Sequence, residues 1–270
     1  MMRVFLHAGC HKTGTTSAQG FLFHNRERIW PHAALILPQR AQPVTRAVHA
    51  CLDDPGPDGR VAITRAMADL LAGMDLHPKR RILVSAENLL GRMPLGLPPE
   101  PYPDAAPILR ALVAAFEGLG WPVEVTIYLS TRPQKAWAES VWAHQLRKDH
   151  LFPLTDDLPE FAARLGRVPL AEQVARIAAA LPDLALHHHD LADLAEAPFG
   201  PGQPFLEFLN LPAEKRAAFT PVPPGQIAPP RAISAKLLEL NRSGLDRRAL
   251  AAAKRALLDG PPPATDRSPA

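Results

Sequence analysis

Short apolar runs alternate along this chain with longer segments in which apolar residues recur every three or four positions. The short runs predict β-strands at 3–7, 35–37, 82–85, 123–129 and 184–188. The longer segments predict helices, as in 60–74, where Ile63, Met67, Leu70 and Met74 fall on one helical face. Strands that alternate with helices favour a three-layer α/β fold, with a mainly parallel central sheet and helices on both faces.

Further helices are predicted where similar spacing occurs, at 15–25, 108–119, 133–148, 158–165, 170–181, 205–209, 234–241 and 246–258. Turn-forming residues dominate 39–59, and the prolines of 93–107 exclude a helix or a central strand there, because proline lacks the backbone N–H. Both segments are predicted loops. We expect residues 1–258 to form a single domain and 259–270 to be a disordered, proline-rich tail.

The composition changes this picture little. The chain has 270 residues, 47% hydrophobic and 21% charged, so it can bury the core of a large domain and is not disordered by composition. The 30 Lys and Arg residues exceed the 27 Asp and Glu residues by a net charge of +3. This small excess suits an anionic small ligand, and we do not expect nucleic acid as a partner.

Two cysteines, Cys10 and Cys51, are too few for a disulfide framework or a four-cysteine metal site. No apolar run approaches the ~18 residues of a membrane span, and the N-terminal apolar run is too short for a signal peptide. The sequence therefore predicts a cytoplasmic protein without stable membrane insertion. It does not indicate the oligomeric state.

The most informative segment lies between the first predicted strand and the first long helix, and it reads Gly9-Cys10-His11-Lys12-Thr13-Gly14-Thr15-Thr16. A turn of this kind directs unpaired backbone N–H groups and the positive end of the helix dipole at one point. Gly9 and Gly14 permit a close approach of the backbone, while Lys12 adds a mobile cation. The segment predicts a site for a phosphate-like dianion.

Two other interpretations of this loop are weaker. The spacing from Gly9 to Gly14 matches half of the nucleotide-binding P-loop, but Thr15 stands where that motif requires lysine. A P-loop kinase or other NTPase therefore remains the alternative function. Cys10 suggests a phosphatase nucleophile, yet position 16 holds threonine instead of the phosphate-binding arginine, so Cys10 is better interpreted as a small core residue.

The run from His11 to Thr16 resembles the 5′-phosphosulfate-binding loop of the sulfotransferases, and it is most similar to the bacterial branch. This resemblance implies a P-loop-like sulfotransferase fold and the cofactor 3′-phosphoadenosine 5′-phosphosulfate (PAPS), with no metal. It also implies roles for six residues at the 5′-phosphosulfate, namely His11, Lys12, Thr13, Gly14, Thr15 and Thr16. Lys12 would stabilise the charge that develops on the bridging oxygen.

A second constellation lies more than a hundred residues away. Arg132 follows the strand 123–129, and Ser140 lies about two turns into the next predicted helix, which Pro133 opens as its first residue. A guanidinium with a hydroxyl is a suitable receptor for a terminal phosphate. In sulfotransferases an arginine and a serine at this spacing bind the cofactor's 3′-phosphate, so the resemblance implies that role for Arg132 and Ser140.

A sulfuryl acceptor must lose the proton of its hydroxyl, which requires a general base. Glu87 follows the strand 82–85, and carboxyl ends of parallel strands meet at the ligand crevice. The bacterial sulfotransferases have a similar Ser-x-Glu segment, so we take Glu87 as the catalytic base, with a helix-capping role as the alternative. His11 is the competing base, although beside a bound dianion its protonated form is favoured.

The remaining candidate residues give weaker evidence for a functional role. His187, His188 and His189 are interpreted as structural or surface residues, because neighbouring strand positions face opposite sides. Trp137 and Trp142 are expected in the core or the adenine pocket. The segment 220–231 stands where sulfotransferases close the cofactor site, but it lacks the expected basic-glycine character. The acceptor is predicted to be a small molecule or a glycan, and the resemblance implies the hydroxyl of a carbohydrate or glycolipid. A non-catalytic nucleotide-binding relative is a further alternative.

Overall fold

Five parallel strands form the centre of the molecule in this computed structural model. The strands are β1 (Met2–His7), β2 (Ala33–Ile36), β3 (Arg81–Ser85), β4 (Val123–Thr131) and β5 (Ala185–Asp190). Their order in the sheet is β2-β3-β1-β4-β5, and every pairing is parallel. The structure describes residues 1–94, 100–148, 152–165, 168–223, 225 and 229–260. The predicted α/β fold with a mainly parallel sheet is confirmed, and the sheet is in fact wholly parallel.

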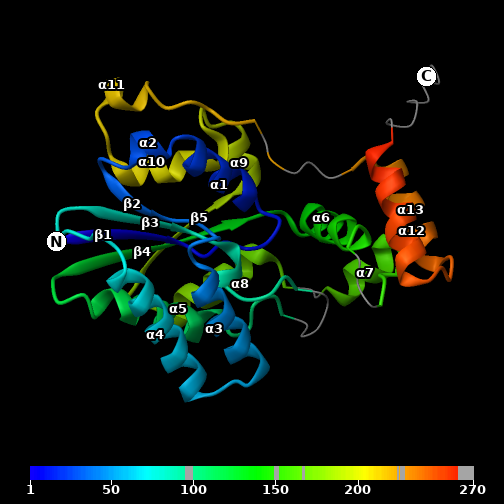
Figure 1. Cartoon of the computed structure of the whole chain (residues 1–270), viewed down its shortest axis with the longest axis horizontal. Coiled ribbons are helices and arrows are strands. Elements are labelled where there is room, and N and C mark those ends of the chain that lie inside the picture. Colours follow the sequence, from blue (N-terminus) through cyan, green and yellow to red (C-terminus); the bar gives the residue numbers. More distant parts are fainter. Residues whose placement is uncertain (95–99, 149–151, 166–167, 224, 226–228, 261–270) are drawn as a thin grey trace.

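Helices cover both faces of the sheet, which makes the predicted three layers (Figure 1). One face carries α1 (Thr15–His24), α2 (Arg26–Ile29), α9 (Leu191–Ala195), α10 (Gln203–Leu209) and α11 (Ala213–Arg216). The other carries α3 (Gln42–Asp53), α4 (Pro57–Ala72), α5 (Ala105–Glu117) and α8 (Leu170–Ala180). Short 3₁₀ turns are η1 (Glu87–Leu89) and η2 (Gly200–Gly202).

The two faces of the sheet bury different side chains, as alternation along a strand requires. On β1, Val4 and Leu6 belong to the larger apolar core with α3, α4 and α5. Phe5 points the other way, into a second core with α1 and α10, where its ring stacks on Tyr128 at 5.1 Å. Because both faces are covered, the strands are apolar on both sides, which explains the short continuous apolar runs of the sequence.

The structure corrects several predicted boundaries. The predicted loop 39–59 contains α3 and the start of α4, because Val44, Val48 and Cys51 recur at helical spacing and are all buried. The prediction that 93–107 contains no helix is wrong at the end of this segment. There α5 begins at Ala105, and Pro107 is tolerated in the first turn of the helix. Residues 95–99 and 261–270 lie outside the described residues, so the predicted tail is not tested.

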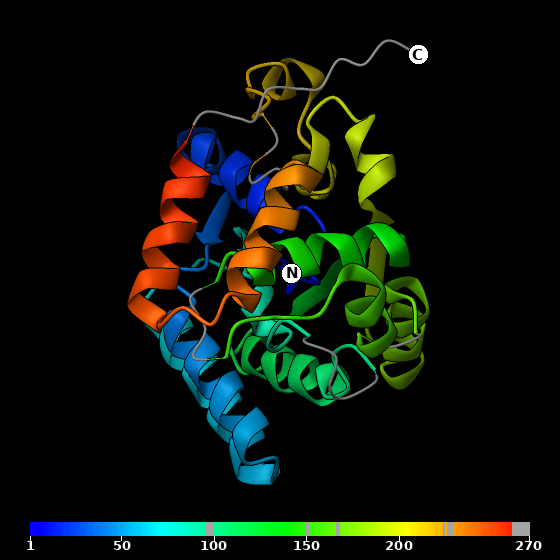
Figure 2. The ribbon, with the colours of Figure 1, turned by 90° about the vertical axis from the view of Figure 1, so that its right-hand side faces the viewer.

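Four helices gather at the carboxyl-terminal end of the strands, where Figure 2 views the molecule. They are α6 (Gln134–Leu146), α7 (Leu158–Arg164), α12 (Arg231–Arg242) and α13 (Arg247–Asp259). Pro133 is the residue before α6 instead of its first residue, and its carbonyl accepts a hydrogen bond from Trp137 N at 2.8 Å. The extended conformation of Pro133 turns the chain from β4 into α6, which starts beside the strand end.

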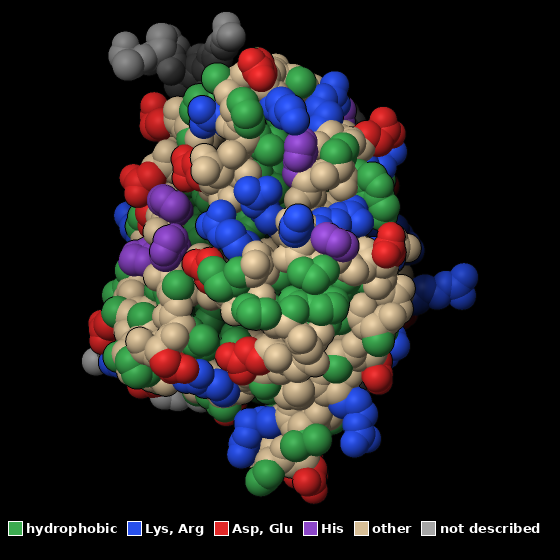
Figure 3. Space-filling model, turned by 90° about the vertical axis from the view of Figure 1, so that its left-hand side faces the viewer, with side chains coloured by type: hydrophobic (Ala, Val, Ile, Leu, Met, Phe, Trp, Pro, Cys, Tyr) green, Lys and Arg blue, Asp and Glu red, His purple; other side chains and the backbone are tan. Residues whose placement is uncertain are grey.

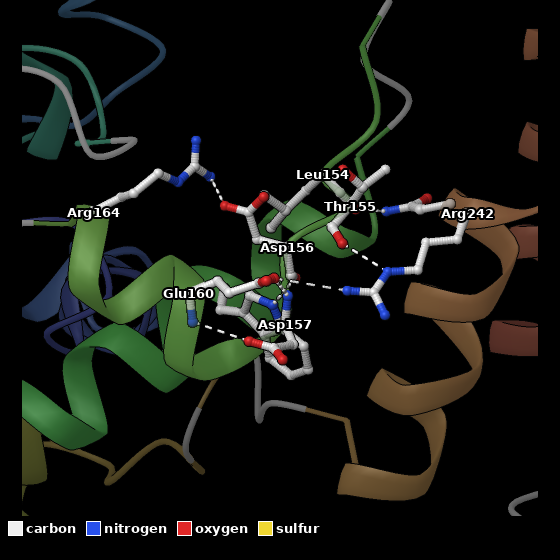
Figure 4. Close-up of polar contacts among 9 residues, drawn as sticks. Leu154, Thr155, Asp156, Asp157, Glu160, Arg164 and Arg242 are labelled. Carbon is white, nitrogen blue, oxygen red and sulfur yellow. Dashed lines mark hydrogen bonds and ion pairs between the residues drawn. The ribbon is translucent and has the colours of Figure 1, made fainter.

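Polar contacts fasten α12 and α13 to the segments that follow α6 (Figure 4). Arg242 Nε donates to the Thr155 carbonyl at 2.7 Å, and Arg242 also pairs with Glu160 of α7 at 3.8 Å. On α13, the buried Lys254 donates from Nζ to the carbonyl of Lys148 at 2.8 Å. Helix α12 also contacts α6, the helix that carries Ser140.

The packing of η2 on α1 gives a stability prediction. A Cβ at Gly202 would lie 2.4 Å from the ring of the buried Phe21, so we expect Gly202→Ala to destabilise the protein by about 1–3 kcal/mol through overpacking. At Gly20, within α1 itself, a Cβ would meet only Val222 at 3.9 Å. Gly20→Ala should therefore stabilise by roughly 0.5–1 kcal/mol, because alanine is the better helix former.

Thermal or urea unfolding of the two variants measures this difference. Both substitutions add one methyl group on the same face of the sheet, so each serves as the control for the other. An unchanged midpoint in Gly202→Ala would show that η2 can move away from α1 at little cost.

No helix within the described residues is long and apolar enough to cross a membrane.

Candidate functional site

The loop between β1 and α1 curves around the start of α1. Gly9, Lys12 and Gly14 have φ angles of 59°, 66° and 91°, in the left-handed region that favours glycine. At Gly14, a Cβ would in addition lie 2.6 Å from Leu191 Cδ1, so the backbone approaches its neighbours closely there. Gly14 precedes α1 without a side-chain cap, and no acidic residue stands in the first turn. The first turn of α1 therefore contributes no negative charge of its own to offset the positive end of the helix dipole.

Buried hydrogen bonds hold this loop in shape. Thr13 is fully buried, and its Oγ1 donates to the Cys10 carbonyl and contacts Ser130 Oγ on β4, both at 2.6 Å. Trp137 Nε1 on α6 donates to the His11 carbonyl at 2.9 Å. The Thr13 hydroxyl thus braces the loop and is not among the groups that line the pocket described next. Trp137 is likewise buried in the core and supports the loop from α6.

A pocket of about 630 Å³ opens at the carboxyl-terminal end of the sheet. Residues that the sequence singled out line it together, from four separate segments: His11, Lys12, Gly14, Thr15, Thr16, Glu87, Arg132 and Ser140. This is where the topology predicts a ligand crevice, because β1, β3 and β4 are neighbours and end on the same side. Of the eight predicted cofactor-binding residues, only Thr13 does not line the pocket.

Arg132, at the end of β4, contacts the loop between β1 and α1. Its Nη1 donates to the carbonyl of Lys12 at 3.3 Å, so the guanidinium lies beside the loop instead of facing away from it. Ser140 is buried on α6 and lines the same pocket. No carboxylate among the described residues forms an ion pair with Arg132. The charge of this guanidinium is therefore available to an anionic ligand in the pocket.

Lys12 stands in a cationic environment. Burial lowers its pKa first, and the charges of Arg147 and Arg132 lower it further, while Glu87 acts in the opposite direction. Arg147 is half-buried, and its Nε is enclosed without a hydrogen-bond partner among the described residues. Lys12, Arg132 and Arg147 outnumber Glu87, the carboxylate that acts on Lys12, and such an excess of positive charge favours the binding of an anion, which relieves the repulsion among the cations.

Glu87 begins the short turn η1 and lines the pocket from the side of β3. Its Oε2 accepts a hydrogen bond of 2.5 Å from Gln19 Nε2 on α1. Glu87 makes no side-chain cap of η1, so the alternative capping role is not what the structure shows. The carboxylate is held at the pocket by one oxygen, and Gln19 was missed because an isolated glutamine in a helix carries no sequence signal.

Hydrogen bonds to Tyr102 and Asn88 hold the backbone and the ring of His11. Its backbone N–H donates to Tyr102 Oη at 2.7 Å, and its Nδ1 contacts the same hydroxyl at 2.9 Å. Its Nε2 lies 3.1 Å from Asn88 Oδ1, an acceptor, so Nε2 carries the proton and Nδ1 accepts from Tyr102. Burial lowers the pKa of His11, and the effect of a bound dianion on its protonation stays a prediction. Both ring nitrogens are occupied, which leaves His11 without a lone pair for a substrate.

His144 lines the pocket and was not among the predicted site residues. It stands one helical turn after Ser140, so both side chains lie on the same side of α6. Burial, followed by the charges of Lys12, Lys148 and Arg147, lowers the pKa of His144 to about 4. The imidazole is therefore neutral at pH 7. The four-residue spacing from Ser140 is the signal that could have found it.

Apolar residues form the remaining wall of the pocket, on the side of α9 and η2. They include Leu191, Phe199, Pro201, Pro221 and Val222. The last two belong to the segment predicted to close the cofactor site, and Gly225 of that segment donates from its backbone N–H to Ser17 Oγ at 2.9 Å. Residues 226–228 lie outside the described residues.

Two other candidates lie away from this pocket. Arg231 pairs with Glu139 at 3.0 Å on the surface and does not line the pocket. His187, His188 and His189 lie on the edge strand β5, and His189 packs its ring against Tyr128 at 5.8 Å. Within the part of the chain that the structure describes, no group of three or more metal-ligating residues comes together. Burial raises the pKa of Cys10 to about 12, so this thiol stays protonated in the core.

A scan against protein-family models finds no match to this chain, and a search of curated proteins finds no relative. The resemblance of the loop to that of the sulfotransferases therefore stays a prediction, which the geometry of the pocket has to support.

Proposed function

We propose that this protein is a PAPS-dependent sulfotransferase, which transfers a sulfuryl group to an acceptor hydroxyl. The observation that carries the proposal is the common pocket of Lys12, Arg132 and Ser140, which combines the start of α1 with a guanidinium from the end of β4. An adenylate with anionic groups at both its 5′ and 3′ positions matches two clusters of donors in one pocket. ATP offers no 3′-phosphate to Arg132 and Ser140.

The groups of the pocket fit this cofactor chemically. The uncapped N–H groups of α1, with Thr15 and Thr16, are donors for a 5′-phosphosulfate, and Arg132 with Ser140 are donors for a 3′-phosphate. Bound in this way, the cofactor supplies the sulfuryl group. Lys12 would stabilise the negative charge that develops on the leaving oxygen of the bound cofactor.

Glu87 receives the proton of the acceptor hydroxyl in this proposal. Its carboxylate lines the pocket, and Gln19 leaves one of its oxygens without a hydrogen bond from the described residues. His11, the competing base, has both ring nitrogens engaged. The apolar wall and a small-molecule or glycan acceptor are compatible, but the wall does not select among hydroxyl compounds.

Isothermal titration with 3′,5′-bisphosphoadenosine (PAP) and with ATP plus Mg²⁺ tests the proposal. PAP keeps both anionic ends of the cofactor, so we expect it to bind at least ~10-fold more tightly than ATP, with or without magnesium. Equal or tighter binding of Mg·ATP would favour the P-loop kinase or NTPase. Tight binding of PAP without turnover of labelled PAPS on any acceptor would favour a non-catalytic relative.

A further inference from the structure

The proposed cofactor leaves one cation beside the pocket without an assigned role. Arg147 ends α6, and it follows Ser140 by seven residues and His144 by three. Residues at these spacings share one side of a helix, so Arg147 continues the row with which Ser140 and His144 line the pocket. Side chains on a helix lean toward its amino-terminal end, which directs the guanidinium of Arg147 back toward His144.

The guanidinium of Arg147 is open to a ligand at its outer end. Nε is enclosed by protein and has no hydrogen-bond partner among the described residues. Nη1 and Nη2 are not enclosed in this way, and neither forms a hydrogen bond with a described group. A bound anion would therefore reach Arg147 at its two terminal nitrogens without breaking a contact among the described residues.

The carboxylates of the segment next to the end of α6 do not neutralise Arg147. Asp156 pairs with Arg164, and Glu160 pairs with Arg242 at 3.8 Å (Figure 4). Burial lowers the pKa of Arg147, and no described carboxylate raises it. A half-buried guanidinium without a counter-charge is unfavourable, because the loss of its hydration is not offset. An anionic ligand would supply the missing partner.

Arg147 lies close to the groups that carry out the proposed reaction. Of the charges that act on the pKa of Lys12, that of Arg147 has the largest effect, before that of Arg132, and Glu87 acts with the opposite sign. Arg147 stands about 10 Å further along α6 than Ser140, because a helix rises 1.5 Å per residue. The guanidinium is therefore near the proposed transfer site and separate from the proposed position of the 3′-phosphate.

We infer that Arg147 binds an anionic group of the acceptor and makes the enzyme selective for hydroxyl compounds that carry a carboxylate or a phosphate-type group. This inference rests on the proposed function, because it assigns the acceptor side of the same pocket. The anionic ends of the cofactor are assigned to the start of α1 and to Arg132, which leaves Arg147 for the acceptor. The bound cofactor repels a second anion, and the guanidinium offsets this repulsion. Arg147 takes no part in bond breaking.

Four phenols that share one ring and one hydroxyl test the inference. 4-Hydroxyphenylacetate and 4-hydroxybenzylphosphonate are anions of the carboxylate and the phosphate type, 4-hydroxyphenylacetamide is neutral, and tyramine is a cation. In transfer from PAPS by the full-length protein, we expect kcat/KM for at least one anion to exceed that for the amide by about 10- to 100-fold, mainly through KM. Tyramine should be the poorest acceptor. The better of the two anions identifies the type of group that Arg147 prefers.

Arg147→Gln should place both anions below the amide, because the cofactor then repels an anionic acceptor without compensation. The rate with the amide should stay within about threefold. Arg147→Glu should make tyramine the preferred probe, and Arg147→Lys, which keeps the charge, should retain part of the preference for the anion. The control is Arg65→Gln, which removes an equal charge from the exposed surface of α4 and should leave the order unchanged.

Three results would overturn the inference. The order of the probes could persist in Arg147→Gln. All four probes could lose rate equally in that variant, which would give Arg147 a merely structural role at the negative end of the α6 dipole. Arg147→Gln could weaken the binding of PAP by more than about tenfold, which would assign the guanidinium to the cofactor.

Calorimetric titration of the probes into the complex with PAP gives a readout that does not depend on turnover. The dissociation constants should follow the order expected for kcat/KM. If PAP binds and neither anion binds more tightly than the amide, the inference about Arg147 is wrong while the proposed function stands. If PAP does not bind to the unchanged protein, the proposed function itself fails.

Discussion

Glu87→Gln should lower the kcat for sulfuryl transfer by about 10²–10⁴-fold, because the amide keeps the shape of the side chain but cannot take a proton. Binding of PAP should stay within about twofold of the unchanged protein. The structure makes this separation possible, since Glu87 lies on η1 and neither Arg132 nor Ser140 depends on it for a hydrogen bond. Single-turnover assays with labelled PAPS measure the chemical step, and calorimetry measures the binding.

A matched control lies at the opposite end of the sheet. Glu124 pairs with Arg3 at 3.7 Å, near the amino-terminal ends of β1 and β4. Figure 3 shows the surface at this end, where basic, acidic and histidine side chains are interspersed. Glu124→Gln removes the same charge and should leave turnover unchanged. Activity that survives Glu87→Gln would reject Glu87 as the base, whatever the control shows.

Arg132→Ala should weaken the binding of PAP by about 10- to 150-fold, which corresponds to the 1.5–3 kcal/mol typical of hydrogen bonds to charged groups. The same substitution should change the affinity for adenosine 5′-phosphosulfate, which lacks the 3′-phosphate, by less than about threefold. This contrast separates a receptor for the 3′-phosphate from a general contribution to the positive potential of the pocket. Calorimetry on both ligands measures it.

Arg132→Lys keeps the charge but not the planar pair of donors. Its affinity for PAP should therefore lie between that of the unchanged protein and that of Arg132→Ala. Arg3→Ala removes an equal charge at the amino-terminal end of the sheet and serves as the control. An equal loss for both nucleotides in Arg132→Ala would place the guanidinium near the 5′ end and contradict its assigned role. The hydrogen bond from Arg132 to the Lys12 carbonyl makes a change in loop shape the competing explanation, which Arg132→Lys also tests.

The layered fold was predictable because its signals are local. Parallel strands covered on both faces must be apolar at consecutive positions, and β1, β3 and β4 show this in their sequences. The segment 39–59 was mispredicted for a related reason: prolines and glycines surround α3, and the three buried positions of its short apolar stripe were outweighed by turn formers. In such a segment the turn formers and the apolar stripe favour different structures, and the packing of α3 against α4 and η1 decides the outcome.

The shape of the loop between β1 and α1 was also predictable, since Gly9 and Gly14 lie only five positions apart and both have the left-handed φ angles that glycine permits. The role of each side chain was less so. Thr13 and His11 stand within the same run as Lys12, yet both turn into the protein and bond to residues that are 117 and 91 positions away, Ser130 and Tyr102. The spacing of residues along the chain indicates which residues belong to the same loop, but not the direction in which each side chain points.

The sequence by itself determined that this chain forms a parallel α/β sheet with a glycine-containing loop after its first strand, because both depend on residues that are close together in the chain. Only the tertiary structure decided which distant groups share the pocket. The order β2-β3-β1-β4-β5 places the ends of β1, β3 and β4 side by side, and so brings Glu87 and Arg132 to Lys12. The same packing lowers the pKa of His144 and brings Tyr102 and Asn88 to the ring nitrogens of His11. These contacts join distant segments, so no single segment predicts them.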